Sequence, residues 1–138
     1  MIDFTNETDI KIDLSLCKKI AKEFTKDSIE LILTSNNKMQ KLNREYRNID
    51  KPTDVLSFPL EKLSNTPIGI IVINIDKVIE KSKELNHSID DEFALLFLHG
   101  LLHIVGYDHQ SDSGQMREKE REIILKYSLP KSLIIRSK

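Results

Sequence analysis

Apolar residues recur along the chain with two different spacings, one typical of strands and one typical of helices. Short alternating or continuous apolar runs predict strands at residues 1–6, 28–34, 55–58 and 68–73. Longer stretches with apolar positions three or four residues apart predict helices at residues 13–25, 36–46, 74–85, 88–105 and 112–127. This order predicts an α+β fold, in which a small mixed sheet of about four strands packs with about five helices, in one domain spanning 1–138.

Polar residues at the predicted helix ends indicate where three of the helices begin. Asn36 and Asn74 are candidate N-caps, and Ser88 with Asp91 three residues later forms a capping-box pattern. The buried stripe of the helix after Asn36 is predicted to consist of Met39, Leu42 and Tyr46. The lone cysteine, Cys17, lies in an apolar helical stripe, so we interpret it as a buried small hydrophobe.

The helix predicted at 88–105 is apolar nearly all round, so we expect it in the centre of the fold. His99 and His103 interrupt its apolar surface, and residues four apart share one helix face. Two imidazoles in such surroundings are costly without a shared partner, because each must satisfy its polar nitrogens. Gly106 can end the helix in a left-handed conformation and turn the chain so that His109 joins the other two.

Three histidines in this arrangement predict a site for one zinc ion, held by His99, His103 and His109. Three protein ligands leave the fourth tetrahedral position open for water, which is typical of catalytic rather than structural zinc. The alternative interpretation is that these histidines are hydrogen-bonded residues of a core helix. The fourth histidine, His87, precedes the helix in a polar loop, and we interpret it as a surface residue.

The same histidine spacing occurs in the metzincin protease motif, H-E-x-x-H-x-x-G-x-x-H. In that motif the glutamate after the first histidine acts as the general base for the metal's water. This chain has Gly100 at that position. A metalloprotease would therefore lack its central acid–base group, which makes it the least favoured functional hypothesis.

Composition and charge limit the partners and the compartment. Lys and Arg number 21, Asp and Glu number 22, and the formal net charge is -1, so no global positive field attracts nucleic acid. Any RNA contact must come from a local basic edge, for which the candidates are Lys38, Lys41, Arg44, Arg47 and Lys51. With no visible secretory signal, no apolar stretch long enough for a bilayer and a single cysteine, we expect a cytoplasmic protein without membrane contact.

Two blocks of the sequence resemble the YbeY endoribonuclease family. Residues 99–109 read HGLLHIVGYDH and match the family signature H-G-x-L-H-x-x-G-Y-D-H. Residues 42–47 and 50–59 read LNREYR and DKPTDVLSFP, and they are similar to the family's L-N-x-x-Y-R and D-K-P-T-[ND]-V-L-S-F-P block. The two blocks stand in the family's order, and the resemblance runs over most of the chain, from residue 30 to residue 127.

This resemblance implies a bacterial, cytoplasmic, single-strand-specific and zinc-dependent endoribonuclease. Family members act in ribosomal RNA processing, notably at the 3′ end of 16S rRNA, and in late-stage ribosome quality control. Single-stranded rRNA and ribosomal subunits are therefore the implied partners, and no DNA substrate is expected. By residue-for-residue match, the implied zinc ligands are His99, His103 and His109, and Arg47 is the implied catalytic residue.

Several residues near the implied site have two interpretations. Arg47 offers a permanent positive charge to phosphate oxygens, whereas a solvated arginine at a helix end is the simpler interpretation without the resemblance. Asp108 is either a partner of a ligating imidazole or a turn-forming residue. Family members commonly carry Gly-Asp where this chain has Gly69 and Ile70, which removes a carboxylate that could orient a ligand or partner near the site.

Three functional hypotheses follow, with a zinc-dependent endoribonuclease first. The second is a non-enzymatic ribosome-assembly factor in which the metal stabilises the fold, and the third is the metalloprotease. In the endoribonuclease, the attacking group is either a water activated by the metal or the ribose 2′-OH, and the sequence does not separate these routes.

Overall fold

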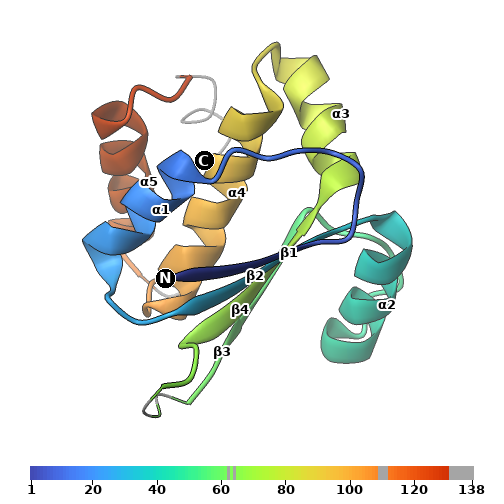
Figure 1. Ribbon diagram of the computed structural model, residues 1–138, viewed down its shortest axis with the longest axis horizontal. Helices are drawn as coiled ribbons and strands as arrows, with labels where there is room; N and C mark the ends of the chain where they lie inside the picture. Colours follow the sequence, from blue (N-terminus) through green and yellow to red (C-terminus); the bar gives the residue numbers. More distant parts are fainter. Residues whose placement is uncertain (62, 64, 109–111, 131–138) are drawn as a thin grey trace.

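The computed structural model describes residues 1–61, 63, 65–108 and 112–130. Within these residues the strands are β1 (Ile2–Asn6), β2 (Ile29–Thr34), β3 (Val55–Pro59) and β4 (Gly69–Asn74). The helices are α1 (Ser15–Phe24), α2 (Asn36–Arg47), α3 (Ile75–Leu85), α4 (Ile89–Ile104) and α5 (Gln115–Lys126). The predicted α+β fold with four strands and five helices is thereby confirmed (Figure 1).

The strands form one mixed sheet in the order β1-β2-β4-β3. β1, β2 and β4 run parallel, and β3 pairs with β4 in the antiparallel direction, with Val55 opposite Ile73 and Pro59 opposite Gly69. A parallel neighbour requires a crossover connection, which α1 supplies between β1 and β2. β3 is therefore an edge strand of this sheet and pairs on one side only.

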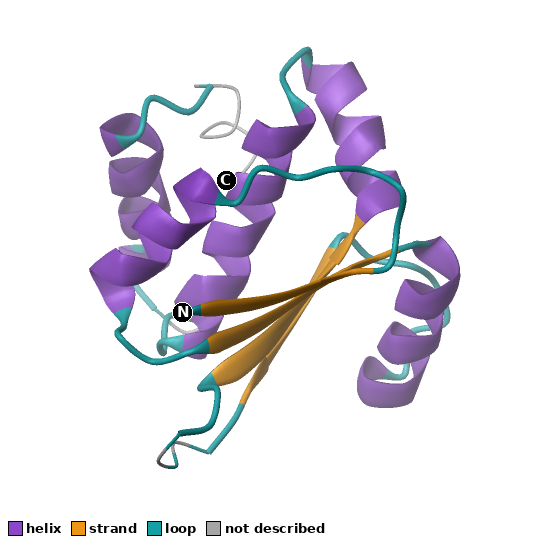
Figure 2. Ribbon diagram, viewed as in Figure 1, coloured by secondary structure: helices purple, strands orange, loops and turns teal. Residues whose placement is uncertain are grey.

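The main core lies between the sheet and a layer formed by α1, α3, α4 and α5 (Figure 2). In β2, Ile29, Leu31 and Leu33 are fully buried on this side, because alternate residues of a strand share a face. α4 packs against β3 and β4 and also against the other helices of this layer, and ten of its sixteen residues are buried. The predicted central helix is confirmed. None of the described helices is long and apolar enough to cross a membrane.

The opposite face of the sheet carries a smaller cluster under α2. Met39 of α2 is buried there with Leu56 and Val72, and Ile70 packs against them. Because the neighbours of Ile70 along β4 face α4, its own side chain points away from α4. Tyr46, predicted to be buried, is 62% exposed, and its ring makes an edge-on contact with the ring of Phe58.

Two of the three predicted N-caps are confirmed. Asn74 caps α3 and Ser88 caps α4, and each side-chain oxygen accepts a hydrogen bond from a backbone N–H two or three residues further on. The predicted cap at Asn36 is wrong, because this residue is the first of the helix and Ser35 precedes it as N-cap. Asn36 instead accepts a hydrogen bond through Oδ1 from the side-chain amide of Asn74, at 2.8 Å, so the amide joins two helix starts.

Cys17 is buried in α1, as predicted from its apolar surroundings. Burial raises the pKa of its thiol to about 12, because the thiolate would be separated from water. The thiol therefore stays protonated at neutral pH and behaves as a small apolar side chain.

Two glycines allow α4 to approach the sheet closely. A Cβ atom on Gly69 of β4 would lie 2.5 to 2.9 Å from three side-chain carbons of Ile104, in the last turn of α4. A Cβ atom on Gly100 of α4 would lie 3.0 Å from Cγ2 of Ile71 in β4. The absence of a side chain at one position on each element therefore sets the spacing between them.

We expect Gly69→Ala to destabilise the fold by about 1–3 kcal/mol, because a methyl group must displace Ile104 in a packed region. The measurement is urea-induced unfolding of the variant beside the unchanged protein. Ile104→Ala removes the three carbons that clash, so the double variant should lose less stability than the sum of the two single losses. Strictly additive losses would contradict the close approach.

Candidate active-site groove

His99 and His103 lie one turn apart on α4 and present their rings together at the rim of the core. The ring centroids are 4.9 Å apart and the planes are inclined by 80°. The side chain of His99 is 33% exposed, whereas most of the helix around it is buried. The predicted common face of the two residues is thereby confirmed.

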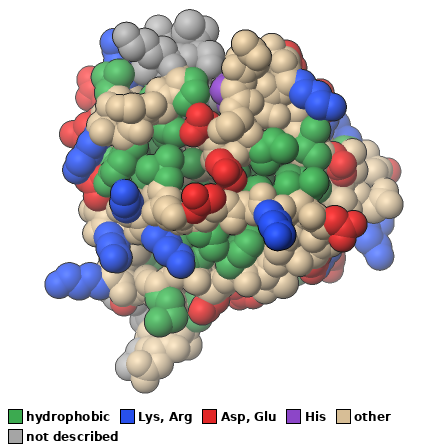
Figure 3. All heavy atoms as spheres, turned by 45° about the horizontal axis from the view of Figure 1, so that its top comes forward, with side chains coloured by type: hydrophobic (Ala, Val, Ile, Leu, Met, Phe, Trp, Pro, Cys, Tyr) green, Lys and Arg blue, Asp and Glu red, His purple; other side chains and the backbone are tan. Residues whose placement is uncertain are grey.

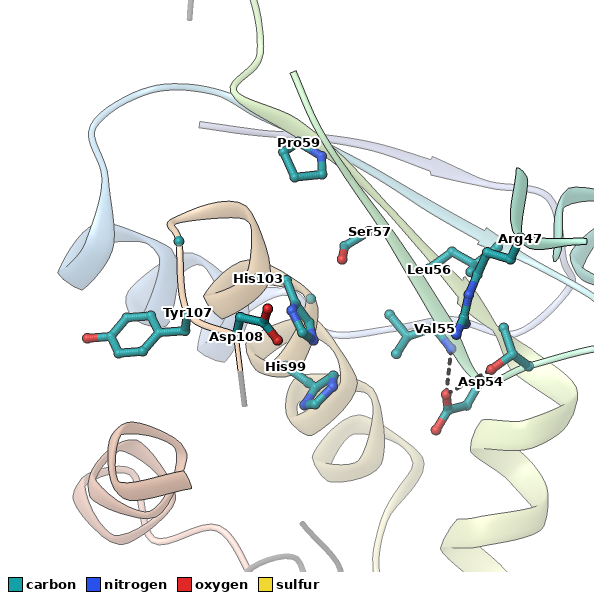
Figure 4. A pocket seen from close by; sticks show the side chains of 13 residues that line it. Arg47, Asp54, Val55, Leu56, Ser57, Pro59, His99, His103, Tyr107 and Asp108 are labelled. Carbon is teal, nitrogen blue, oxygen red and sulfur yellow. Dashed lines mark hydrogen bonds between the residues drawn. The ribbon is translucent and has the colours of Figure 1, made fainter. Parts of the chain in front are cut away.

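The two histidines line an open groove with a volume of about 650 Å³ between α4 and β3 (Figure 4). From α4 and the turn after it come His99, Gly100, His103, Gly106, Tyr107 and Asp108. From β3 and the two residues before it come Thr53, Asp54, Val55, Leu56, Ser57 and Pro59. α2 contributes its last residue, Arg47. The groove therefore joins three segments that are far apart in the sequence.

Arg47 is brought to the groove by the way α2 ends. Asn48 adopts a left-handed conformation with φ of 58°, and its N–H closes the helix on the carbonyl of Arg44. The exposed guanidinium of Arg47 then lies beside the start of β3 (Figure 4). The rest of the predicted basic edge is partly neutralised, since Lys38 pairs with Glu7 at 2.7 Å and Arg44 lies 3.5 Å from an aspartate oxygen.

Glu120 is a residue of this site that sequence reasoning missed. It belongs to α5, its side chain is 2% exposed, and its Oε1 lies 2.6 Å from Nδ1 of His99. An ionised carboxylate only accepts hydrogen bonds, so with Glu120 ionised Nδ1 of His99 is the donor. This arrangement fixes the ring orientation and leaves Nε2 as the nitrogen whose lone pair can bind a ligand.

The sequence does contain a signal for Glu120. The buried side of α5 consists of Met116, Glu120, Ile123 and Ile124, at spacings of four, three and one. A glutamate in an otherwise apolar helical stripe is costly to bury without a partner. That partner must be sought among polar residues elsewhere in the core, and His99 is one of them.

The side chain of His87, interpreted from the sequence as a surface residue, is in fact buried. Its side chain is 4% exposed, and Nε2 lies 2.9 Å from Oε1 of Glu92, whose side chain is 0% exposed. The interpretation failed because the turn after α3 folds back, with the N–H of His87 donating to the carbonyl of Ser82. This pair lies near the start of α4, whereas the groove lies near its end.

Gly100 lies where a metzincin has its catalytic glutamate, and its surroundings are those of a packing residue. A side chain at this position would begin 3.0 Å from Ile71 of the sheet. The chain therefore places the backbone of α4 against β4 at the point where a protease needs a carboxylate, which agrees with the low ranking of the protease hypothesis.

The third predicted metal ligand, His109, lies outside the described residues. Asp108, one position earlier, lines the groove. Within the described residues no three His, Cys, Asp or Glu side chains form a group that could hold a metal ion. The structure therefore brings together His99, His103 and Arg47, and the participation of His109 stays a prediction.

The chain is similar to known proteins over nearly its whole length. Residues 3–128 match the family model described as Endoribonuclease YbeY. Proteins named endoribonuclease YbeY from a Nitratiruptor species and from Nautilia profundicola are 52% and 53% identical, over 99% of this chain and 96% and 99% of the relative. A solution structure of a Thermotoga maritima protein superposes with a TM-score of 0.63 at 29% identity, covering 93% of this chain and 92% of that one.

We expect Glu120→Ala to release the His99 ring from its Nδ1–H tautomer, because the acceptor of that hydrogen is removed. Ring ¹⁵N chemical shifts of His99 in metal-free protein, at a pH where the ring is neutral, measure the tautomer directly. Glu118→Ala is the matched control, since Glu118 is exposed on the same helix. Unchanged His99 shifts in Glu120→Ala would show that the carboxylate does not set the tautomer.

Proposed function

The chain belongs to the endoribonuclease YbeY family, and from this premise we propose that the groove between α4 and β3 is the active site of a single-strand-specific, zinc-dependent endoribonuclease. The observation that carries the proposal is the convergence of Arg47 with His99 and His103 on one groove. We further propose that the substrate is ribosomal RNA, with roles in 3′ end maturation of 16S rRNA and in ribosome quality control. A cytoplasmic location and contact with ribosomal subunits belong to the same proposal.

The donor set of the groove fits a zinc ion. Two imidazoles lie within ring contact of each other, and imidazole nitrogen is a preferred zinc ligand. The hydrogen bond between His99 and Glu120 has the form that orients ligating histidines in zinc proteins. We propose His109 as the third ligand, which follows His103 after the left-handed turn at Gly106, where φ is 106°.

The residues of the groove have separate tasks in RNA cleavage. Arg47 binds the non-bridging oxygens of the scissile phosphate and stabilises the negative charge that accumulates there in the transition state. Asp54 and Asp108 also line the groove. A bound zinc ion would supply Lewis acidity and a water of lowered pKa at the histidines. Glu120 holds the ring of His99 in place.

With a net charge of -1, an RNA substrate must be bound by local groups. Arg47 is the basic side chain that lines the groove, while Lys38 and Arg44, on the same helix, are paired with carboxylates. A volume of about 650 Å³ lies within the range of sites for small ligands.

We expect Arg47→Ala and His103→Ala each to reduce cleavage of a single-stranded rRNA 3′ fragment by about 100-fold or more, since each removes a group acting on the transition state. Electrophoresis of labelled RNA measures the rate, with zinc content determined on the same samples. Arg44→Ala is the matched control for charge on α2, because it is exposed and pairs with Asp50 outside the groove.

The same assay separates the endoribonuclease from the assembly factor. Equal trace cleavage by the unchanged protein and by both folded variants would identify the activity as contamination. Ribosome association that survives in the His103→Ala variant would then favour the assembly factor.

We expect Glu120→Ala to weaken zinc binding by about 10- to 100-fold, because the ring of His99 loses the acceptor that orients it. Competition with a chromogenic chelator measures the affinity without any enzymatic assay. Glu118→Ala, which changes the same charge on the exposed side of α5, should bind zinc as the unchanged protein does. Equal affinities of all three proteins would argue against zinc at His99.

A further inference from the structure

The backbone of β3 forms one wall of the groove. The side chain of Leu56 is 4% exposed and belongs to the cluster on the opposite face of the sheet, yet Leu56 lines the groove. What Leu56 presents to the groove is therefore its backbone. Since β3 pairs only with β4, its unpaired edge runs along the groove opposite His99 and His103 (Figure 4).

The register shows which backbone groups point to this edge. Asn74 donates to the carbonyl of Asp54 at 2.8 Å, and Leu60 donates to the carbonyl of Ile68 at 2.9 Å. Hydrogen-bonded pairs alternate along an antiparallel ladder, so every second residue of β3 has both backbone groups turned away from β4. These outward residues are Val55, Ser57 and Pro59, which also line the groove.

Two of the three outward residues offer no backbone donor. The N–H of Val55 donates to Oδ1 of Asp54 at 2.8 Å, as the dashed line in Figure 4 shows. Pro59 has no N–H. The N–H of Ser57 is therefore the single outward donor of β3, with carbonyl oxygens of Val55 and Ser57 on either side of it.

This pattern of backbone donors and acceptors disfavours an added peptide strand and fits a nucleobase. An added peptide strand uses donors and acceptors at regular intervals, and two of the three donors are missing. A nucleobase needs only one donor and one acceptor side by side, and every unpaired RNA base presents such a pair on its Watson–Crick edge. In a duplex that edge is already occupied by the partner base.

We propose that the outward edge of β3 reads the Watson–Crick edge of an unpaired base next to the scissile phosphate, through the N–H of Ser57 and a flanking carbonyl of Val55 or Ser57. This inference rests on the proposed endoribonuclease function and deepens it. Arg47 holds the phosphate at one end of the groove, and the β3 edge holds the base beside it. Because all four bases carry a donor next to an acceptor, the edge selects single strands with little preference for sequence.

The test uses short single-stranded RNA substrates in which one uridine at a time is replaced by N3-methyluridine. The methyl group removes the donor of the Watson–Crick edge and leaves the phosphate, the ribose and the base ring in place. We expect kcat/KM to fall by about tenfold or more when the methylated base lies next to the cut, the size of one lost hydrogen bond. Methylation at distant positions should have little effect.

Two substitutions at one position identify the protein group. Ser57→Pro removes the N–H and leaves the ladder to β4 intact, because that N–H points away from β4. Ser57→Ala removes the hydroxyl and keeps the N–H. We expect the proline variant to cleave the unmethylated RNA about tenfold more slowly and to lose most of the discrimination against methylation. The alanine variant should discriminate as the unchanged protein does.

The outcomes separate this inference from the proposed function. Equal cleavage of methylated and unmethylated RNA by the unchanged protein overturns the reading by β3, as does full discrimination by a folded Ser57→Pro variant. If the proline variant does not fold, the methylation scan on the unchanged protein decides alone. Absence of RNA cleavage by zinc-loaded unchanged protein would instead overturn the endoribonuclease proposal.

Discussion

The close packing of α4 on the edge of the sheet is the constraint on which the groove depends. Gly69 and Gly100, on opposite sides of this contact, leave no room for a side chain between helix and strands. The helix therefore presents His99 and His103 directly opposite the backbone of β3. A larger spacing would separate the imidazoles from the strand and from Arg47, and the three segments would no longer line one groove.

Two buried glutamates in the helix layer each lie beside a histidine. Glu120 meets His99 near the end of α4, and Glu92 meets His87 near its start. Each pair brings a carboxylate and an imidazole into surroundings that are otherwise apolar, which requires good geometry to compensate for desolvation. The surface of the helix layer is mixed in charge, with acidic and basic side chains interspersed over hydrophobic ones (Figure 3).

The sequence predicts the order and type of the elements, because apolar residues recur along each of them at a spacing typical of a strand or of a helix. It also predicts the common face of His99 and His103, which follows from spacing within one helix. It does not predict the partner of His99, because Glu120 lies on another helix and only tertiary packing joins them. The sequence also does not predict which face of β4 carries Ile70, since strand alternation gives two faces without saying which one bears the site. Which backbone groups of β3 point away from β4 depends on the strand register. The sequence does not predict the register either, because it is a property of the paired sheet.

The groove uses residues spread from Arg47 to Glu120, so its completion follows the order in which the chain is synthesised. A growing chain acquires Arg47 and β3 first, then the histidines of α4, and the acceptor for His99 only with α5. Until that last helix has packed, the imidazole has no buried carboxylate to hold it. A chain that has emerged only as far as α4 therefore presents both histidines without the group that orients His99.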